Sequence, residues 1–142
     1  MTNQSEIRAF ALQQIEALLG RFVFELHRAA QSNDPEAVHD LRVSIRRLSQ
    51  ALRVFAAFFP AREVKKIRRR LRAILDAAAE VRDRDIALEL CDRAGIPPDA
   101  PLRAAFETAR REAEQAFKDL LKECERRGFS ARWRSRLHLV AA

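Results

Sequence analysis

The chain has 142 residues, of which 48% are hydrophobic and 33% charged, and its formal net charge is +7. This length suits one domain with a single core, and a composition dominated by alanine, leucine, arginine and glutamate favours helices over a sheet. No apolar run reaches the ~20 residues that a membrane span needs, and the polar start from Met1 to Ile7 lacks a signal pattern. A membrane-embedded class is therefore excluded, and a cytoplasmic location is expected.

Four amphipathic helices are predicted in chain order, because apolar residues recur at spacings of three and four. They span about Ser5–Gln31, Pro35–Phe59, Arg62–Asp92 and Ala100–Gly128. Short breaks rich in proline, glycine and polar residues separate them, and short connections make consecutive helices antiparallel. The expected fold is all-α, an antiparallel up-down four-helix bundle formed by residues 1–128.

Residues 129–142 form an apolar tail that contains Trp133 and Leu137 and is too short for a full bundle helix. It is expected either to fold over the end of the bundle or to begin a fifth helix that packs on a partner, such as a second copy of the chain. Cys91 and Cys124 match no metal or redox spacing, so both are expected to be free, and no metal or other cofactor is expected.

The positive charge is concentrated in one third of the chain. Between His39 and Arg72 two acidic side chains, Asp40 and Glu63, oppose eleven lysines and arginines, which gives this segment +9 and leaves −2 for the rest. Solvated helix faces usually mix both signs, whereas a local excess of one sign indicates an anionic partner.

The basic residues of the second and third predicted helices fall on narrow stripes. At roughly 100° per residue, one stripe of the second helix holds His39, Arg42, Arg46, Gln50 and Arg53. The third helix carries a similar stripe of Lys65, Arg68 and Arg72. The two stripes either face one another across a groove or point apart, depending on the hand of the hairpin, which the sequence leaves open. Arginine suits a phosphate-binding groove because its planar fork donates paired hydrogen bonds to phosphate oxygens.

The segment Arg82-Asp83-Arg84-Asp85 closes the basic region with carboxylates. One interpretation is ordinary salt bridging on a helix surface. In the other, Asp83 or Asp85 orients an arginine of the second helix while Arg82 faces the ligand.

Two segments resemble the CHAD family, helical domains named for their histidine. They are DPEAVHDLRVSIRRLSQALRVF (34–55) and VRDRDIALEL (81–90), and the resemblance covers about Glu6 to Arg127. It implies binding of inorganic polyphosphate without catalysis. The residues that match the family motifs are His39, Arg42, Arg46, Arg47 and Arg82 for binding, and Asp83 and Asp85 as supporting salt bridges. Helical geometry adds Arg53, Lys65, Arg68 and Arg72.

Two features depart from the family pattern. Ser49 occupies a position where the family often has another basic residue, and the sequence resembles one half of the usual pair of bundles. The chain is then a natural half-domain, a piece cut from a longer protein, or a subunit whose homodimer rebuilds that pair. The alternatives to a polyphosphate-binding protein associated with polyphosphate granules are a nucleic-acid-binding helical protein, a metal-dependent enzyme acting on phosphate chains, and a basic protein scaffold.

Overall fold

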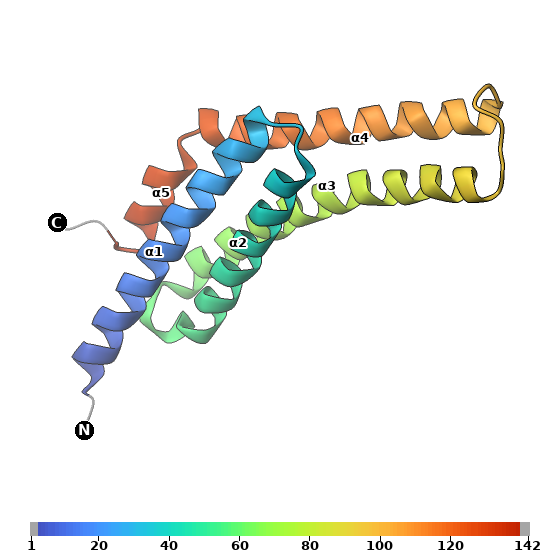
Figure 1. Ribbon diagram of the computed structural model, residues 1–142. Helices are drawn as coiled ribbons and strands as arrows, with labels where there is room; N and C mark the ends of the chain where they lie inside the picture. The colour runs from blue at the N-terminus through green and yellow to red at the C-terminus, as the bar shows by residue number, and fades with distance from the viewer. Residues whose placement is uncertain (1–2, 140–142) are drawn as a thin grey trace.

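A computed structural model describes residues 3–139 as five α-helices and one short 3-10 turn (Figure 1). The helices are α1 (Gln4–Gln31), α2 (Pro35–Val54), α3 (Ala61–Arg93), α4 (Pro101–Arg126) and α5 (Phe129–Arg136), and the 3-10 turn η1 (Ala56–Phe58) lies between α2 and α3. Residues 1–2 and 140–142, including the end of the predicted tail, lie outside the described residues. The prediction of an all-helical chain is confirmed, whereas the up-down bundle of four helices is not.

The helix starts follow from their capping residues. Asn3 caps α1, because its side chain accepts a hydrogen bond from the backbone N–H of Glu6 at 2.8 Å. Asp34 caps α2 in the same way through the N–H of Glu36 at 3.0 Å, and Pro35 fills the first helical position, where its missing N–H costs nothing. The break between α1 and α2 is therefore short and well defined.

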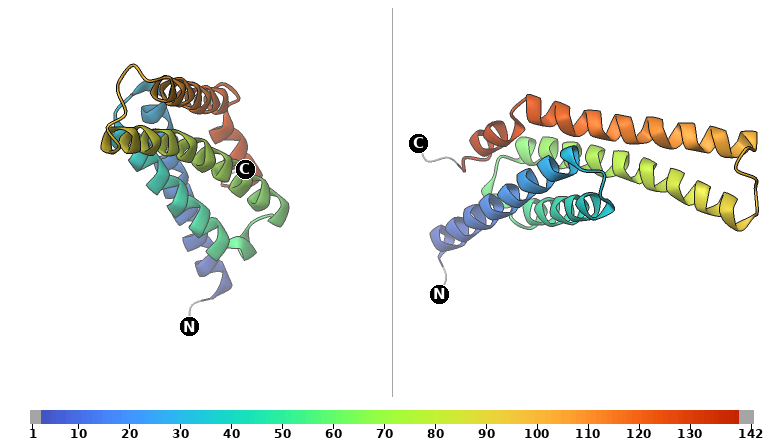
Figure 2. Two further views of the ribbon diagram at one scale, coloured as in Figure 1. Left: turned by 90° about the vertical axis from the view of Figure 1, so that its right-hand side faces the viewer. Right: turned by 45° about the horizontal axis from the view of Figure 1, so that its top comes forward.

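The helices form two hairpins of different length. The first, α1 with α2, lies beside the inner halves of α3 and α4, and the outer halves of α3 and α4 continue beyond it as an arm (Figures 1 and 2). The buried residues of α3 stop at Ala78, apart from Cys91, and those of α4 begin at Phe117. The core therefore lies at one end of the molecule, and the arm is a two-helix projection.

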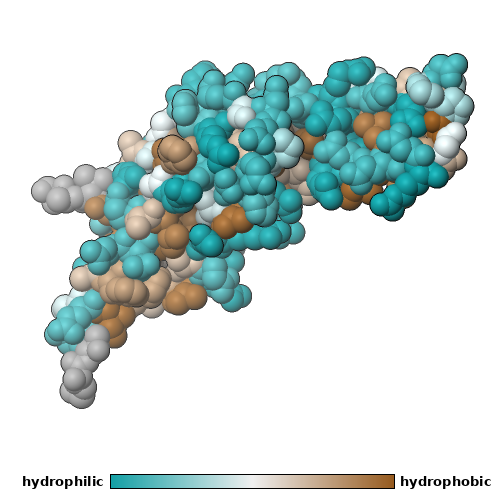
Figure 3. All heavy atoms as spheres, in the orientation of Figure 1, coloured by the Kyte–Doolittle hydropathy of each residue, from teal (hydrophilic) through white to brown (hydrophobic). Residues whose placement is uncertain are grey.

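The arm leaves apolar side chains in contact with solvent. Figure 3 shows brown patches among its mainly hydrophilic surface, and the exposed large hydrophobic residues include Ile86, Leu90 and Leu102. None of the helices formed by residues 3–139 is long and apolar enough to cross a lipid bilayer.

The tail packs onto the core through aromatic contacts. Gly128 has φ of +63°, a left-handed conformation that lets the chain turn sharply from α4 into α5. The turn brings Phe129 and Trp133 against the fully buried Phe22 of α1, with ring centroids 5.4 and 5.8 Å away. Trp133, expected at the end of the bundle or in a contact to a second copy, is 7% exposed and forms part of the chain's own core.

Candidate anion-binding groove

One hydrogen bond joins α2 and α3 at the level of their basic residues. Arg68 on α3 donates a hydrogen bond from Nε to the Oγ of Ser49 on α2 at 3.2 Å. Around this contact lies a depression of about 220 Å³, lined from both helices by Ile45, Ser49, Arg68, Leu71, Arg72 and Leu75. We call this depression the α2–α3 groove. Arg68 and Arg72 of the α3 stripe thus line a groove shared with α2, whereas no basic residue of the α2 stripe lines it.

A larger cavity of about 370 Å³ continues the groove at the point where the arm leaves the core. We call it the junction pocket. Its walls come from the α1–α2 connection, α2, α3 and α4, and its lining residues are Ser32, Asn33, Pro35, Val38, His39, Arg42, Ala78, Val81, Arg82, Asp85, Arg110, Glu114, Phe117 and Lys118. Because α2 and α3 run in opposite directions, the pocket lies at the beginning of α2 and near the middle of α3.

Three of the binding residues predicted from sequence meet in this pocket, His39 and Arg42 from α2 and Arg82 from α3, together with the predicted supporting residue Asp85. Within the described residues, neither Arg42 nor Arg82 has a carboxylate within 4.0 Å. The Nε of Arg42 is buried and has no hydrogen-bond partner there. A buried donor without an acceptor is costly, and an anionic oxygen would satisfy it.

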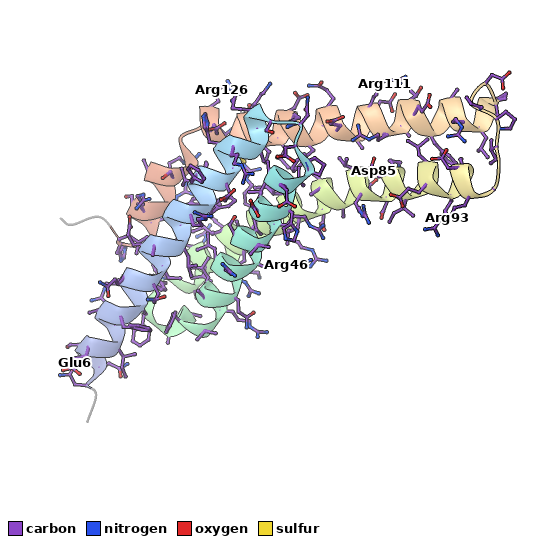
Figure 4. All side chains as sticks on the ribbon, viewed as in Figure 1. Glu6, Arg46, Asp85, Arg93, Arg111 and Arg126 are labelled. Carbon is purple, nitrogen blue, oxygen red and sulfur yellow. The ribbon has the colours of Figure 1, made fainter. Side chains whose placement is uncertain are left out.

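Asp85 pairs with an arginine of α4, and not with an arginine of α2 as one interpretation of the sequence expected. Its Oδ1 accepts a hydrogen bond from Nε of Arg110 on α4 at 2.7 Å, and Nη1 of Arg110 donates to Glu114 at 2.6 Å. The hydrogen bond to Asp85, partly opposed by burial, raises the pKa of the Arg110 guanidinium. The ion-pair partner of Asp85 is thus an arginine of α4 and not of α2. This agrees with Figure 4, where Asp85 lies between α3 and α4, beyond the start of α2. Asp83 is exposed and has no ion pair within residues 3–139.

Lys118 of α4 closes the pocket on the side of the α1–α2 connection. Its ammonium donates hydrogen bonds to the backbone oxygens of Ala29 and Ser32, at the end of α1. A cation at this position also suits the negative end of the helix dipole. Burial lowers the pKa of Lys118, although the nearby Glu114 opposes this effect.

The other predicted binding residues lie outside the pocket. Arg46 and Arg47 line a shallow apolar depression with Leu18 and Val54, and Arg47 also faces α1. Arg53 and Lys65 are exposed. Arg53 follows Ser49 by four residues on α2, and Lys65 precedes Arg68 by three residues on α3. Their helical positions therefore extend the two sides of the α2–α3 groove away from the pocket.

The basic segment is almost free of ion pairs. Of the eleven lysines and arginines between His39 and Arg72, Arg72 alone has a carboxylate within 4.0 Å among the described residues, Asp76 at 3.1 Å. On the arm, by contrast, three of the six arginines between Glu80 and Glu114 are paired, namely Arg84, Arg103 and Arg110. The α2–α3 region thus holds a row of uncompensated cations.

Sequence reasoning missed the pocket residues Arg110 and Lys118. Their spacing of eight places them on one face of α4, but Glu114 lies between them on the same face. Because the charges of α4 are mixed, a search for a local excess of one sign does not find them. No group of three or more His, Cys, Asp or Glu side chains in the described part of the chain is placed to hold a metal ion.

Fold and site together define a small helical domain with a basic, histidine-containing cleft. The family model described as the CHAD domain matches residues 13–142, so the chain belongs to the CHAD family. No match was found among curated proteins or among solved structures.

Proposed function

We propose that this protein binds inorganic polyphosphate in the α2–α3 groove and the junction pocket. The observation that carries the proposal is that ten of the eleven lysines and arginines between His39 and Arg72 have no carboxylate within 4.0 Å among residues 3–139. Of these unpaired cations, Arg68 lines the groove and Arg42 lines the pocket. Like charges held close together destabilise the free protein, and a bound polyanion replaces their repulsion with attraction. Membership of the CHAD family is consistent with a binding module.

The chemistry of the groove suits a chain of phosphates. Guanidinium groups of Arg68 and Arg72 in the groove, and of Arg42 in the adjoining pocket, can donate paired hydrogen bonds to non-bridging oxygens. Lys65 and Arg72 are seven residues apart on α3, which corresponds to roughly 10 Å along the helix axis. Cations along this helix can therefore contact successive phosphates of an extended ligand. Each phosphate contact releases counterions, and affinity should therefore fall steeply with salt.

The walls of the groove favour polyphosphate over nucleic acid. They are formed by the aliphatic side chains of Ile45, Leu71 and Leu75 between the cations. Single-stranded nucleic acids are usually bound with aromatic side chains that stack on the bases. A ligand that consists of phosphates alone needs no such platform.

The proposal is tested by titrating the protein with long-chain polyphosphate at two salt concentrations. We expect a steep salt dependence and a large loss of affinity when His39, Arg42 and Arg82 are replaced together by glutamine. The control variant replaces Arg93 and Arg111, two arginines of the arm labelled in Figure 4, and removes charge without touching groove or pocket. Equal binding by both variants would refute the site.

Two further measurements separate the alternatives. RNA of the same total charge is added as a competitor, and preferential binding of RNA would favour a nucleic-acid-binding protein. Polyphosphate is also incubated with the protein and Mg²⁺ or Mn²⁺, and release of phosphate would indicate an enzyme.

A further inference from the structure

The groove and the pocket differ in how completely they enclose a ligand. The α2–α3 groove has walls from two helices, whereas the junction pocket has walls from α2, α3, α4 and the α1–α2 connection. Lys118 fastens that connection to α4 through the carbonyls of Ala29 and Ser32. A polyanion lying in the groove therefore meets a wall at one end.

The charge of the protein also reverses beyond the pocket. Between Glu80 and Glu114, which covers the arm, nine acidic side chains outnumber six basic ones, giving a formal charge of −3. The segment from His39 to Arg72 carries +9. At the border of the two regions, Asp85 and Glu114 face the pocket while both bind Arg110. A phosphate chain that continued along the arm would meet repulsion.

The donors that converge on the pocket match the end of a phosphate chain better than its middle. A terminal phosphoryl group has three acceptor oxygens and a second ionisation at a pKa of about 6, so near neutral pH it carries more charge than an internal group. Arg42, with a buried Nε that lacks an acceptor, approaches from α2, and Arg82 approaches from α3. These donors come from different sides, as a compact, highly charged group requires.

We propose that the junction pocket receives the terminal phosphoryl group of a linear polyphosphate, whose following phosphates lie along the α2–α3 groove. This inference rests on the proposed function and adds a direction to it. The chain enters from the side of Arg53 and Lys65, passes Arg68 and Arg72, and ends against Arg42 and Arg82. The protein then recognises chain ends, and its binding depends on the number of ends and not only on the number of phosphates.

The test compares two forms of one long-chain polyphosphate, with free ends and with both ends capped by a neutral amine through a phosphoramidate bond. Capping changes the total charge of a long chain very little, so a general electrostatic attraction is nearly unchanged. We expect capping to weaken binding to the parent protein roughly tenfold, the loss of one strong charge-assisted contact. In the variant R42Q/R82Q, capping should have no further effect.

A groove variant, R68Q/R72Q, provides the matched control. It should weaken binding of capped and free chains by the same factor, because it leaves the pocket intact. If the partly buried Arg42 proves necessary for folding, as circular dichroism would show, the exposed Arg82→Gln substitution alone serves in its place.

The outcomes are distinct. Equal affinity of the parent protein for capped and free chains would overturn end recognition, while binding of polyphosphate would still hold. Failure of both chains to bind would instead refute the proposed function, and end recognition with it.

Discussion

The hydroxyl of Ser49 on α2 accepts a hydrogen bond from the Nε of Arg68 on α3 at 3.2 Å, and this contact joins the two basic helices across the groove. A basic residue at this position would add one more charge beside Arg68. The serine instead accepts a hydrogen bond from the guanidinium of the opposite helix, and the two cations that line the groove, Arg68 and Arg72, both come from α3.

Substitution of Ser49 by arginine should therefore lower the stability of the free protein and strengthen ligand binding. The new charge lies beside Arg68 and Arg72, and we expect a loss of roughly 0.5 kcal/mol in the free energy of unfolding at low salt. Polyphosphate affinity should rise, with a steeper salt dependence. Urea denaturation and titration measure the two effects. Gln50→Arg, one residue away but directed to another depression, is the control, and equal effects of both substitutions would contradict the prediction.

Replacement of Arg42 or Arg82 by glutamine should separate binding from stability. Each loss of a charge-assisted contact should cost about 1.5 to 3 kcal/mol of polyphosphate binding. In the absence of ligand neither variant should be less stable than the parent, because these guanidinium groups have no carboxylate partner within residues 3–139. Thermal unfolding with and without polyphosphate tests both points. A lower Tm of the free R82Q variant would show that Arg82 has a structural role.

Asp85→Asn should weaken the support of the pocket from α4. The substitution removes the charge that pairs with Arg110 at 2.7 Å and leaves that guanidinium with Glu114 alone. Both partners are about one-third exposed, so solvent screening limits the loss of stability to about 0.5 to 1 kcal/mol. Asp83→Asn, on the same turn but without an ion pair among the described residues, should have no measurable effect on the urea midpoint. A similar loss in both variants would show that Arg110 is not held by Asp85.

The helices could be predicted from sequence more completely than their arrangement. Apolar periodicity and the caps at Asp34 and Gly128 gave nearly the observed boundaries, except that α2 ends at Val54 and a 3-10 turn precedes Pro60. The arm could not be foreseen, because a helix covered by one neighbour keeps the same three-four spacing as one covered by three. In the structure, the exposed side chains of Leu90 and Leu102 show that the arm helices are covered by one neighbour only, which the spacing of apolar residues does not reveal.

The candidate site was predictable where charge was locally unbalanced. The segment with an excess of positive charge, His39 to Arg72, supplies two cations of the groove, Arg68 and Arg72, and two residues of the pocket, His39 and Arg42. Arg110 and Lys118 come from α4, more than 25 residues further along the chain than Arg82, and are brought to the pocket by the antiparallel return of the arm. Contacts of this kind depend on tertiary packing and leave no local mark in the sequence.

The ion pair between Arg28 and Asp40 should make stability depend on acid pH. The hydrogen bond from Arg28, at 2.6 Å, lowers the pKa of the Asp40 carboxyl below its ordinary value of 3.8, although burial opposes the shift. A carboxyl with a lowered folded-state pKa stabilises the protein above the ordinary value, and this contribution is lost as the pH falls through the lowered value. Asp40→Asn should thus be less stable than the parent at pH 7, and the difference in urea midpoint should disappear at pH values well below 3.8. A constant difference at all pH values would contradict ionisation as the cause.

Truncation of Trp133 should show that α5 belongs to the core. The indole stacks on Phe22 at a centroid distance of 5.8 Å and meets Phe129 edge-on at 5.0 Å. Trp133→Ala removes these contacts and leaves a cavity beneath α5, so we expect a loss of about 3 to 5 kcal/mol in the free energy of unfolding. Trp133→Phe should lose much less, because an aromatic ring still fills most of the space. Urea denaturation gives both values. If alanine cost no more than phenylalanine, α5 would not be packed on Phe22 in solution, and the side of the core opposite the arm would be open to a different partner.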